Sequence, residues 1–197
     1  MWHIVWLLSA MPILDLFYLT LNNDLGPNPQ ETLLRSLGMW SLVFLLLTYS
    51  VSVLNNLGIK NLIGCRRMLG LWGFFYLTIH FFAFFAFEHS FVFSSLVVDF
   101  ISRPFVTFGV IAFILMIPLA LTSNNFSVRL LKKAWKKLHF LINPIIILAL
   151  IHFFLHRAGK NDFLDSFVAL GVFLLCFSVK YSKLLLKIKY LTKKLGS

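Results

Sequence analysis

The segment Trp135-Lys-Lys-Leu-His139-Phe-Leu-Ile-Asn-Pro-Ile-Ile-Ile-Leu-Ala-Leu-Ile-His152-Phe-Phe-Leu-His156 has the length and composition of a membrane-spanning helix that begins among lysines. Two of its histidines, His139 and His152, are thirteen residues apart. An ionisable side chain inside a membrane helix is costly, so it usually faces the interior of the bundle and has a partner there. Neutral imidazole is a common iron ligand in heme proteins. These histidines are therefore the first candidates for binding a cofactor.

The composition is that of an integral membrane protein. The chain has 197 residues, of which 59% are hydrophobic, and its mean hydropathy is +0.87, well above soluble domains. This length leaves room for about six spans with short loops, so residues 1–197 are expected to form a single all-α domain. The first apolar run lacks a basic lead and a small-residue cleavage site, so we expect a mature helix there and not a signal peptide.

Six apolar runs are expected to cross the membrane as helices. Each has about the 17–25 residues needed to cross ~30 Å of hydrocarbon. Loops rich in Asn, Gly and Pro separate them, and no internal repeat is present. The fold predicted is a six-helix transmembrane bundle. Its spans are expected at roughly residues 2–20, 37–57, 69–87, 104–121, 138–156 and 163–179.

The basic residues sort by side of the membrane. Fourteen of the 18 cations lie in the loops before the third and fifth spans and in the C-terminal tail, and these segments hold no acidic residue. The positive-inside rule places these segments and both termini in the cytoplasm. Membrane topology, and not nucleic acid binding, thus explains the net charge of +11. The fourteen are Lys60, Arg66, Arg67, Arg129, Lys132, Lys133, Lys136, Lys137, Lys180, Lys183, Lys187, Lys189, Lys193 and Lys194.

The basic, amphipathic tail, residues 180–197, predicts an anchor to anionic lipid, with partner docking as the alternative. The two cysteines, Cys65 and Cys176, imply no disulfide framework, and the absence of a Cys-x-x-Cys-His motif excludes the usual covalent c-type heme attachment.

Counting from the cytoplasmic side places two histidines at one depth. His80 lies thirteen residues beyond Arg67, about 20 Å along a helix, and His152 lies fifteen residues beyond Lys137, about 22 Å. Both imidazoles are therefore expected in the outer half of the membrane. Two histidines from different helices at equal depth can ligate one iron from opposite faces of a porphyrin. The alternative is simple hydrogen bonding to neighbouring helices.

His139 is expected at the cytoplasmic edge. A second heme there would need a partner near positions 66–67, which hold arginines. On a straight helix His139 and His152 point about 140° apart, although Pro144 between them can alter that phase. His139 thus remains a candidate for a weakly held heme, a propionate contact, a quinone or flavin site, or a structural role. His156, one turn after His152, is an alternative ligand; His3 and His89 are expected on the surface or in loops.

Seven short motifs occur in order along residues 24–181. They are Arg66-Arg-Met-Leu-Gly-Leu-Trp72, Leu77-Thr-Ile-His80, Ser102-Arg-Pro-Phe-Val-Thr-Phe-Gly109, Leu121-Thr-Ser123, Trp135-Lys-Lys-Leu-His139, Ile151-His152 and Lys180-Tyr181. Together they resemble the MsrQ (YedZ) family, heme-binding membrane subunits with a ferric-reductase-like transmembrane domain. On this resemblance the family's heme-associated histidines fall on His80, His139 and His152.

The resemblance implies an electron-transfer subunit of an oxidoreductase complex in the bacterial inner membrane, and no catalytic residue is assigned. Such proteins take electrons from the quinone pool, are also described as using FMN, and pass the electrons through heme b to MsrP. MsrP is a periplasmic molybdopterin enzyme that reduces methionine sulfoxide in proteins. The alternatives are a ferric reductase or quinone-linked cytochrome b, and a heme-free small transporter or assembly factor. Candidates for the partner-docking face are Arg35, Glu88, Asp99, Arg103 and Asp162.

Overall fold

The computed structural model describes residues 2–59, 61–159 and 162–195, with side chains described as far as residue 182. Every regular element among these residues is helical. Lys60, Lys160 and the side chains of the tail lysines after residue 182 lie outside the described part. The helices are α1 (Trp2–Leu21), α2 (Pro29–Asn56), the 3₁₀ turn η1 (Ile63–Cys65), α3 (Arg66–His89), α4 (Phe93–Ser102), α5 (Pro104–Leu121), α6 (Asn125–Leu131), α7 (Lys133–His139), α8 (Ile142–Ala158) and α9 (Leu164–Leu195).

Six helical stretches in the described chain are long and apolar enough to cross a membrane. They confirm the all-α prediction and the six spans. The span at Pro104–Leu121 has the predicted bounds. The second span begins eight residues earlier than expected, because Asn28 accepts a hydrogen bond from the Glu31 amide and caps a helix that opens with Pro29. The short helices α4 and α6 were not predicted.

The segment expected as one span at residues 138–156 is interrupted. Helix α7 ends at His139 and α8 begins at Ile142. Pro144 has no amide hydrogen to donate to the carbonyl four residues earlier, and Asn143 binds that Phe140 carbonyl with both its amide nitrogen and its side-chain Nδ2, at 3.1 and 2.7 Å. His139 and His152 therefore lie on different helices, so the angle of about 140° expected between them on one straight helix does not describe their directions.

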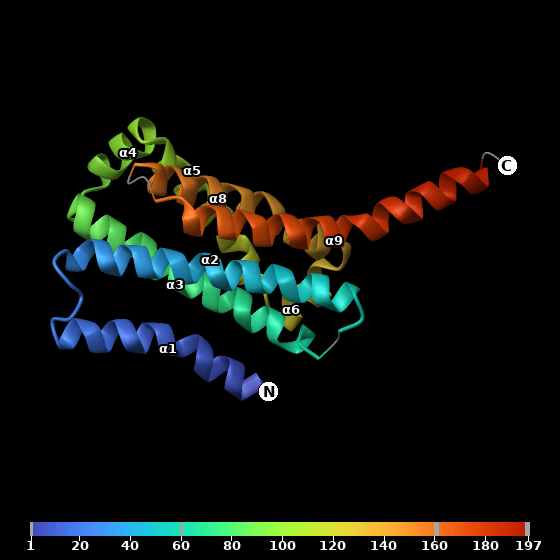
Figure 1. Ribbon diagram of the computed structural model, residues 1–197, viewed down its shortest axis with the longest axis horizontal. Helices are drawn as coiled ribbons and strands as arrows, with labels where there is room; N and C mark the ends of the chain where they lie inside the picture. The colour runs from blue at the N-terminus through green and yellow to red at the C-terminus, as the bar shows by residue number, and fades with distance from the viewer. Residues whose placement is uncertain (1, 60, 160–161, 196–197) are drawn as a thin grey trace.

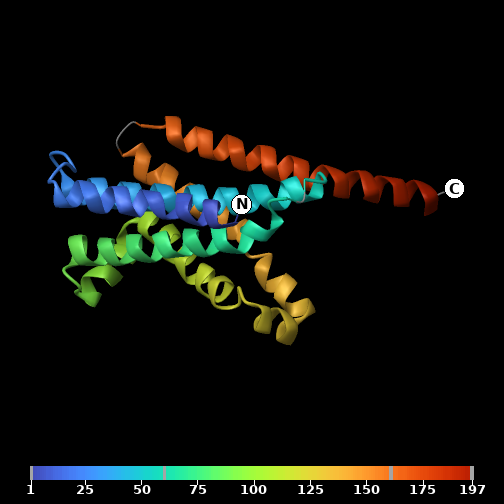
Figure 2. The same cartoon turned by 90° about the horizontal axis from the view of Figure 1, so that it is seen from below.

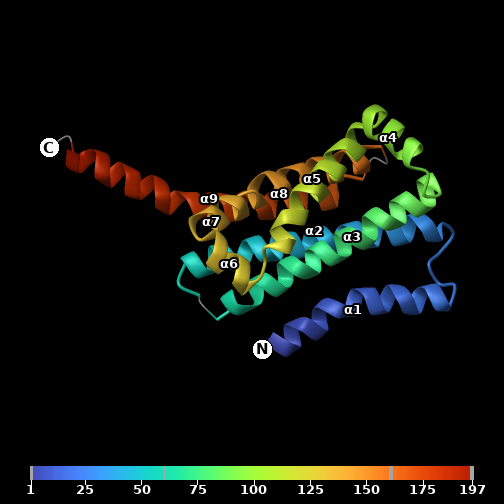
Figure 3. The same cartoon turned by 180° about the vertical axis from the view of Figure 1, so that it is seen from behind.

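The long helices lie side by side, with α2 packed against α3 and α5 packed against α8 (Figure 1). Helix α9 contacts α2 and α8, and α1 covers the outer side of α2 and α3 (Figure 2). Both termini and the helices α6 and α7 lie toward one end of the bundle, and α4 lies at the other (Figure 3). The segments rich in lysine and arginine thus share one end.

Two groups of buried side chains hold these helices together. The larger one joins α2, α5, α8 and α9 around Tyr49, Ile145 and Ile146. The other joins α1, α2 and α3 around Tyr76. Helices α2, α3, α5 and α8 meet between the two groups, and the site described below lies there.

Candidate functional site

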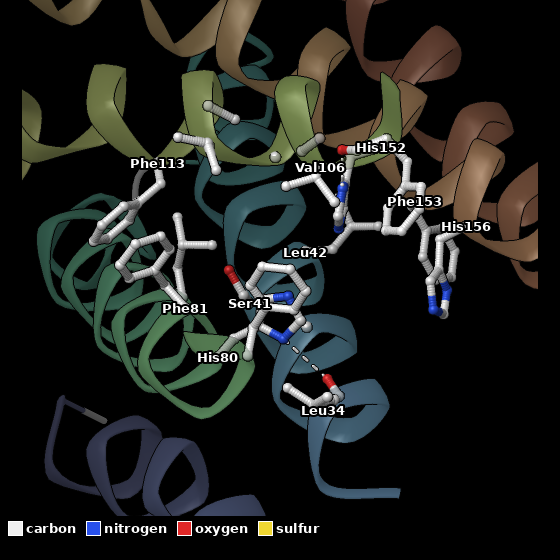
Figure 4. Close-up of a pocket in the computed structure, with 18 of the residues that line it drawn as sticks. Leu34, Ser41, Leu42, His80, Phe81, Val106, Phe113, His152, Phe153 and His156 are labelled. Atoms are coloured by element: carbon white, nitrogen blue, oxygen red, sulfur yellow. Dashed lines mark hydrogen bonds between the residues drawn. The ribbon is translucent and has the colours of Figure 1, made fainter. Parts of the chain in front are cut away.

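The imidazoles of His80 on α3 and His152 on α8 face each other across the bundle (Figure 4). Their ring centres are 6.2 Å apart and their planes are nearly perpendicular, at 78°. Both residues line one cavity of about 220 Å³. The structure therefore brings together the two histidines that were expected at one depth; their role as iron ligands stays a prediction.

Backbone carbonyls of the two other helices fix both rings. His80 Nδ1 lies 3.0 Å from the Leu34 carbonyl on α2, and His152 Nδ1 lies 2.7 Å from the Phe105 carbonyl on α5. Because a carbonyl only accepts, each Nδ1 carries the proton and donates it. In the neutral ring Nε2 is then left with its lone pair. Metal-binding histidines are oriented in this way by hydrogen bonds from the nitrogen that does not bind the metal.

Glycines leave the space that each ring occupies. A Cβ on Gly38 would lie 3.1 Å from the His80 ring, and a Cβ on Gly109 would lie 2.7 Å from His152 Nδ1. Each glycine comes one helical turn after the carbonyl that its histidine binds. Neither glycine was predicted to position a histidine. Gly109 was noted only as the end of a motif, and nothing near Gly38 in the sequence distinguishes it from a glycine that faces open space, such as Gly171.

The cavity is apolar along most of its length and charged at one end. Its wall includes Phe81 and Phe113, stacked with ring centres 4.7 Å apart, and the buried Leu42 and Val106. The charged end lies toward α4, and Arg35, Glu88, Arg103, His156 and Arg157 contribute to it. The ligand that suits such a cavity is largely apolar and carries anionic groups at one edge.

The donor set fits heme and not a metal held by protein ligands alone. No group of three or more His, Cys, Asp or Glu side chains suited to a metal ion occurs among the described residues, whereas zinc sites use three or four protein ligands. Two histidines suffice where a porphyrin supplies the remaining ligands. A metal bound at about 2 Å by two opposed imidazoles separates their ring centres by roughly 6 Å, which the observed spacing matches.

His139 lies in a second pocket, of about 870 Å³, together with Arg66, Trp72 and Trp135. Its ring stacks on Trp135 with centres 4.0 Å apart. Its Nε2 lies 3.1 Å from Thr122 Oγ1, whose own hydrogen is donated to the Pro118 carbonyl at 2.6 Å. His139 Nε2 is therefore the donor in this contact and has no lone pair for a metal. The structure does not bring His139 to the other two histidines.

His156 lines the same cavity as His152, as expected for neighbours one turn apart on α8.

The prediction that His89 lies on the surface or in a loop is wrong. His89 is 5% exposed, because α4 folds back on the end of α3 and places Ser95 Oγ 2.8 Å from His89 Nδ1 and Asp99 3.4 Å from Nε2. Asp99 also pairs with Arg103 and is only 15% exposed, so it contributes little to an outer surface.

Known proteins are similar to this chain in sequence. The family model described as "Ferric reductase like transmembrane component" matches residues 36–150, which include His80 and His139. No solved structure matches the chain.

Three similar proteins carry the same name, "Protein-methionine-sulfoxide reductase heme-binding subunit MsrQ". The one from Ralstonia nicotianae is 44% identical over 82% of this chain and 75% of its own length. The one from Herminiimonas arsenicoxydans is 43% identical over 79% of this chain and 72% of its own length. The one from Bordetella pertussis is 42% identical over 78% and 75%, respectively.

Proposed function

The chain belongs to the MsrQ family of heme-binding subunits, and on that premise we propose that it is a membrane b-type cytochrome that serves a methionine sulfoxide reductase. The observation that carries the proposal is the pair of facing imidazoles on α3 and α8, each with Nδ1 bound to a carbonyl. In this proposal the imidazoles of His80 and His152 would hold one heme b. When bound, heme supplies one-electron redox chemistry.

The residues around the two histidines bind and orient the cofactor. The carbonyls of Leu34 and Phe105 hold each ring in one tautomer, and Gly38 and Gly109 admit the rings between the helices. The stacked phenylalanines of the cavity wall exclude water. A low dielectric and fixed ligands favour electron transfer, since little has to reorganise around the site.

We place the electron donor at the second pocket. It lies beside the lysine-rich end of the bundle and presents Trp72 and Trp135 as flat aromatic faces, with Arg66 and His139 beside them. Such a surface suits the ring of a quinone or of FMN, and arginine suits a phosphate or carbonyl oxygen. His139 then contacts the donor and not a second iron, in keeping with the hydrogen bond from its Nε2 to Thr122.

Electrons leave at the opposite end, toward a periplasmic, molybdopterin-containing partner of the MsrP type. This direction rests on the positive-inside rule, which puts the lysine-rich end and both termini in the cytoplasm of a bacterial inner membrane. Alkaline phosphatase fused to the C-terminus should stay inactive, whereas fusion after Gly26 in the loop before α2 should give activity. The reverse result would invert the topology and the electron path.

Heme content of histidine variants tests the ligand assignment. We expect His80→Ala and His152→Ala each to lose most of the heme per mole of protein in a pyridine hemochrome assay. His139→Ala should keep most of it, and the exposed His3→Ala is the control for handling losses. Equal heme retention in the His80, His139 and His152 variants would contradict the assignment, and a wild-type protein that binds no heme would favour a heme-free transporter or assembly factor.

The match to a ferric-reductase-like family favours a second candidate, a ferric reductase or another quinone-linked cytochrome b. The acceptor separates the two. The dithionite-reduced protein should be reoxidised by an MsrP-type enzyme with methionine sulfoxide present, and slowly by ferric citrate. Rapid reoxidation by ferric citrate alone would favour the second candidate.

A further inference from the structure

The charged end of the cavity between His80 and His152 has a composition unlike the rest of its wall. Toward α4 the lining includes Arg35, Arg103 and His156 beside one carboxylate, Glu88, whereas the opposite part consists of apolar side chains such as Met116. The α4 end is therefore the part of this described cavity where an anionic group finds cationic partners.

Not every cation at this end is available. Arg157 is 4% exposed and forms ion pairs with both Asp162 and Asp165, so its charge is balanced within the fold. Arg35 contacts Glu31 and Asp162 at 3.6 Å each, and Asp162 is shared with Arg157. These contacts are longer than charge-assisted hydrogen bonds, which are about 2.7–2.9 Å. Arg35 therefore retains donors for another anion.

Arg103 has a similar arrangement on the opposite wall. It pairs with Asp99 at 3.2 Å, and Asp99 is shared with the buried His89. The Arg103 side chain is 49% exposed and contributes to the cavity lining. A guanidinium has five N–H donors, and this single contact leaves most of them for a ligand.

His156, near the end of α8, is the third cationic candidate that lines this cavity. Figure 4 shows its ring projecting from α8 on the same side as that of His152. It makes an edge contact with Phe105, with ring centres 5.8 Å apart, and no hydrogen bond from its ring is found within the described residues. An imidazole placed at the cavity wall one turn from a proposed ligand is a natural donor to a carboxylate on the same cofactor.

We propose that Arg35, Arg103 and His156 bind the two propionates of the heme, so that its carboxylate edge faces the α4 end of the bundle. The proposal rests on the function proposed above. It follows from the asymmetry of the cavity, because a carboxylate placed against Met116 and Ile145 would lose its hydration without gaining a partner. The orientation also puts the charged edge of the macrocycle nearest to the end where a partner enzyme would accept electrons.

Hemin and its dimethyl ester, which lacks the two carboxylates, test this directly. Full-length protein produced without added heme is titrated with each in detergent, and the absorbance change gives both dissociation constants. We expect hemin to bind roughly tenfold or more tightly than the ester, since hydrogen bonds to charged groups are the stronger class. Arg35→Gln, Arg103→Gln and His156→Phe combined should bring the ratio close to one, while Arg129→Gln on the other end leaves it unchanged.

The outcomes are separable. If both porphyrins give the spectrum of iron with two histidine ligands and bind equally well to the wild-type protein, the propionate assignment is wrong and the ligand pair stands. If neither porphyrin gives that spectrum, the proposed heme site is wrong, and the propionate assignment is wrong with it. The ratio of the two dissociation constants is measured on the wild-type protein itself. A triple variant that does not fold therefore does not prevent the test. His156→Gln, which keeps a donor, should retain more of the ratio than His156→Phe.

Discussion

Gly109 lies against the ring of His152 so closely that a Cβ built on it would be 2.7 Å from Nδ1. The same relationship recurs between Gly38 and His80, where the closest approach would be 3.1 Å. In both cases the imidazole donates to the carbonyl four residues before the glycine, from Leu34 and from Phe105. Each histidine ring is thus held in the same way, by a glycine and by the carbonyl one turn before it, on α2 for His80 and on α5 for His152.

Replacing these glycines by alanine should loosen the site unequally. Gly109→Ala must displace the His152 ring, so we expect loss of most of the heme and an altered Soret band. Gly38→Ala requires a shift of a few tenths of an ångström, so we expect partial loss. Heme per mole and the visible spectrum measure both. Gly171→Ala, which meets no atom within 4 Å, is the control, and equal losses in all three would show that space at Gly109 is not what matters.

That His80 and His152 meet at one level of the bundle was predictable, because a helix has a fixed rise per residue and both counts start at a lysine- or arginine-rich helix end. The role of the two glycines was not predictable, because it depends on which helix packs opposite. Pro144 signalled a disturbed helix but not the position of the break between α7 and α8. His89 was misplaced because only the fold-back of α4 buries it.

Thr122→Val should act on the second pocket alone. It removes the hydroxyl that accepts from His139 Nε2 and leaves the stacking of His139 on Trp135 in place. We expect heme content to stay at the wild-type level while electron transfer from a reduced quinone analogue slows several-fold, because the freed ring no longer has one orientation. Stopped-flow heme reduction measures this, with Thr20→Val on α1, outside the second pocket, as the matched control. Loss of heme in Thr122→Val would instead tie His139 to an iron site.

Neutralising the two aspartates that pair with Arg157 should destabilise the protein more than replacing Arg157 itself. Arg157 is buried, while the side chains of Asp162 and Asp165 are 44% and 45% exposed. The double variant Asp162→Asn with Asp165→Asn leaves a buried guanidinium without a counter-charge. We expect its free energy of unfolding to fall by about 3 kcal/mol. Arg157→Met removes the buried charge and should change stability by about 1 kcal/mol or less. Unfolding by SDS titration in mixed micelles compares them, and a larger loss in Arg157→Met would refute this prediction.

Tyr76→Phe should weaken the attachment of α1. Pro12 distorts this helix, and the Tyr76 hydroxyl fills the gap by accepting from the Ile13 amide at 3.1 Å and donating to the Ser9 carbonyl at 2.9 Å. Without the hydroxyl both backbone groups lose a partner in an apolar environment, which costs about 1–3 kcal/mol. Thermal unfolding in detergent should show the loss, and the exposed Tyr18→Phe is the matched control. Because Tyr76 is fully buried and packs its ring on Phe44, the Phe ring keeps that contact, and an unchanged unfolding temperature would mean that α1 does not depend on the inserted hydroxyl.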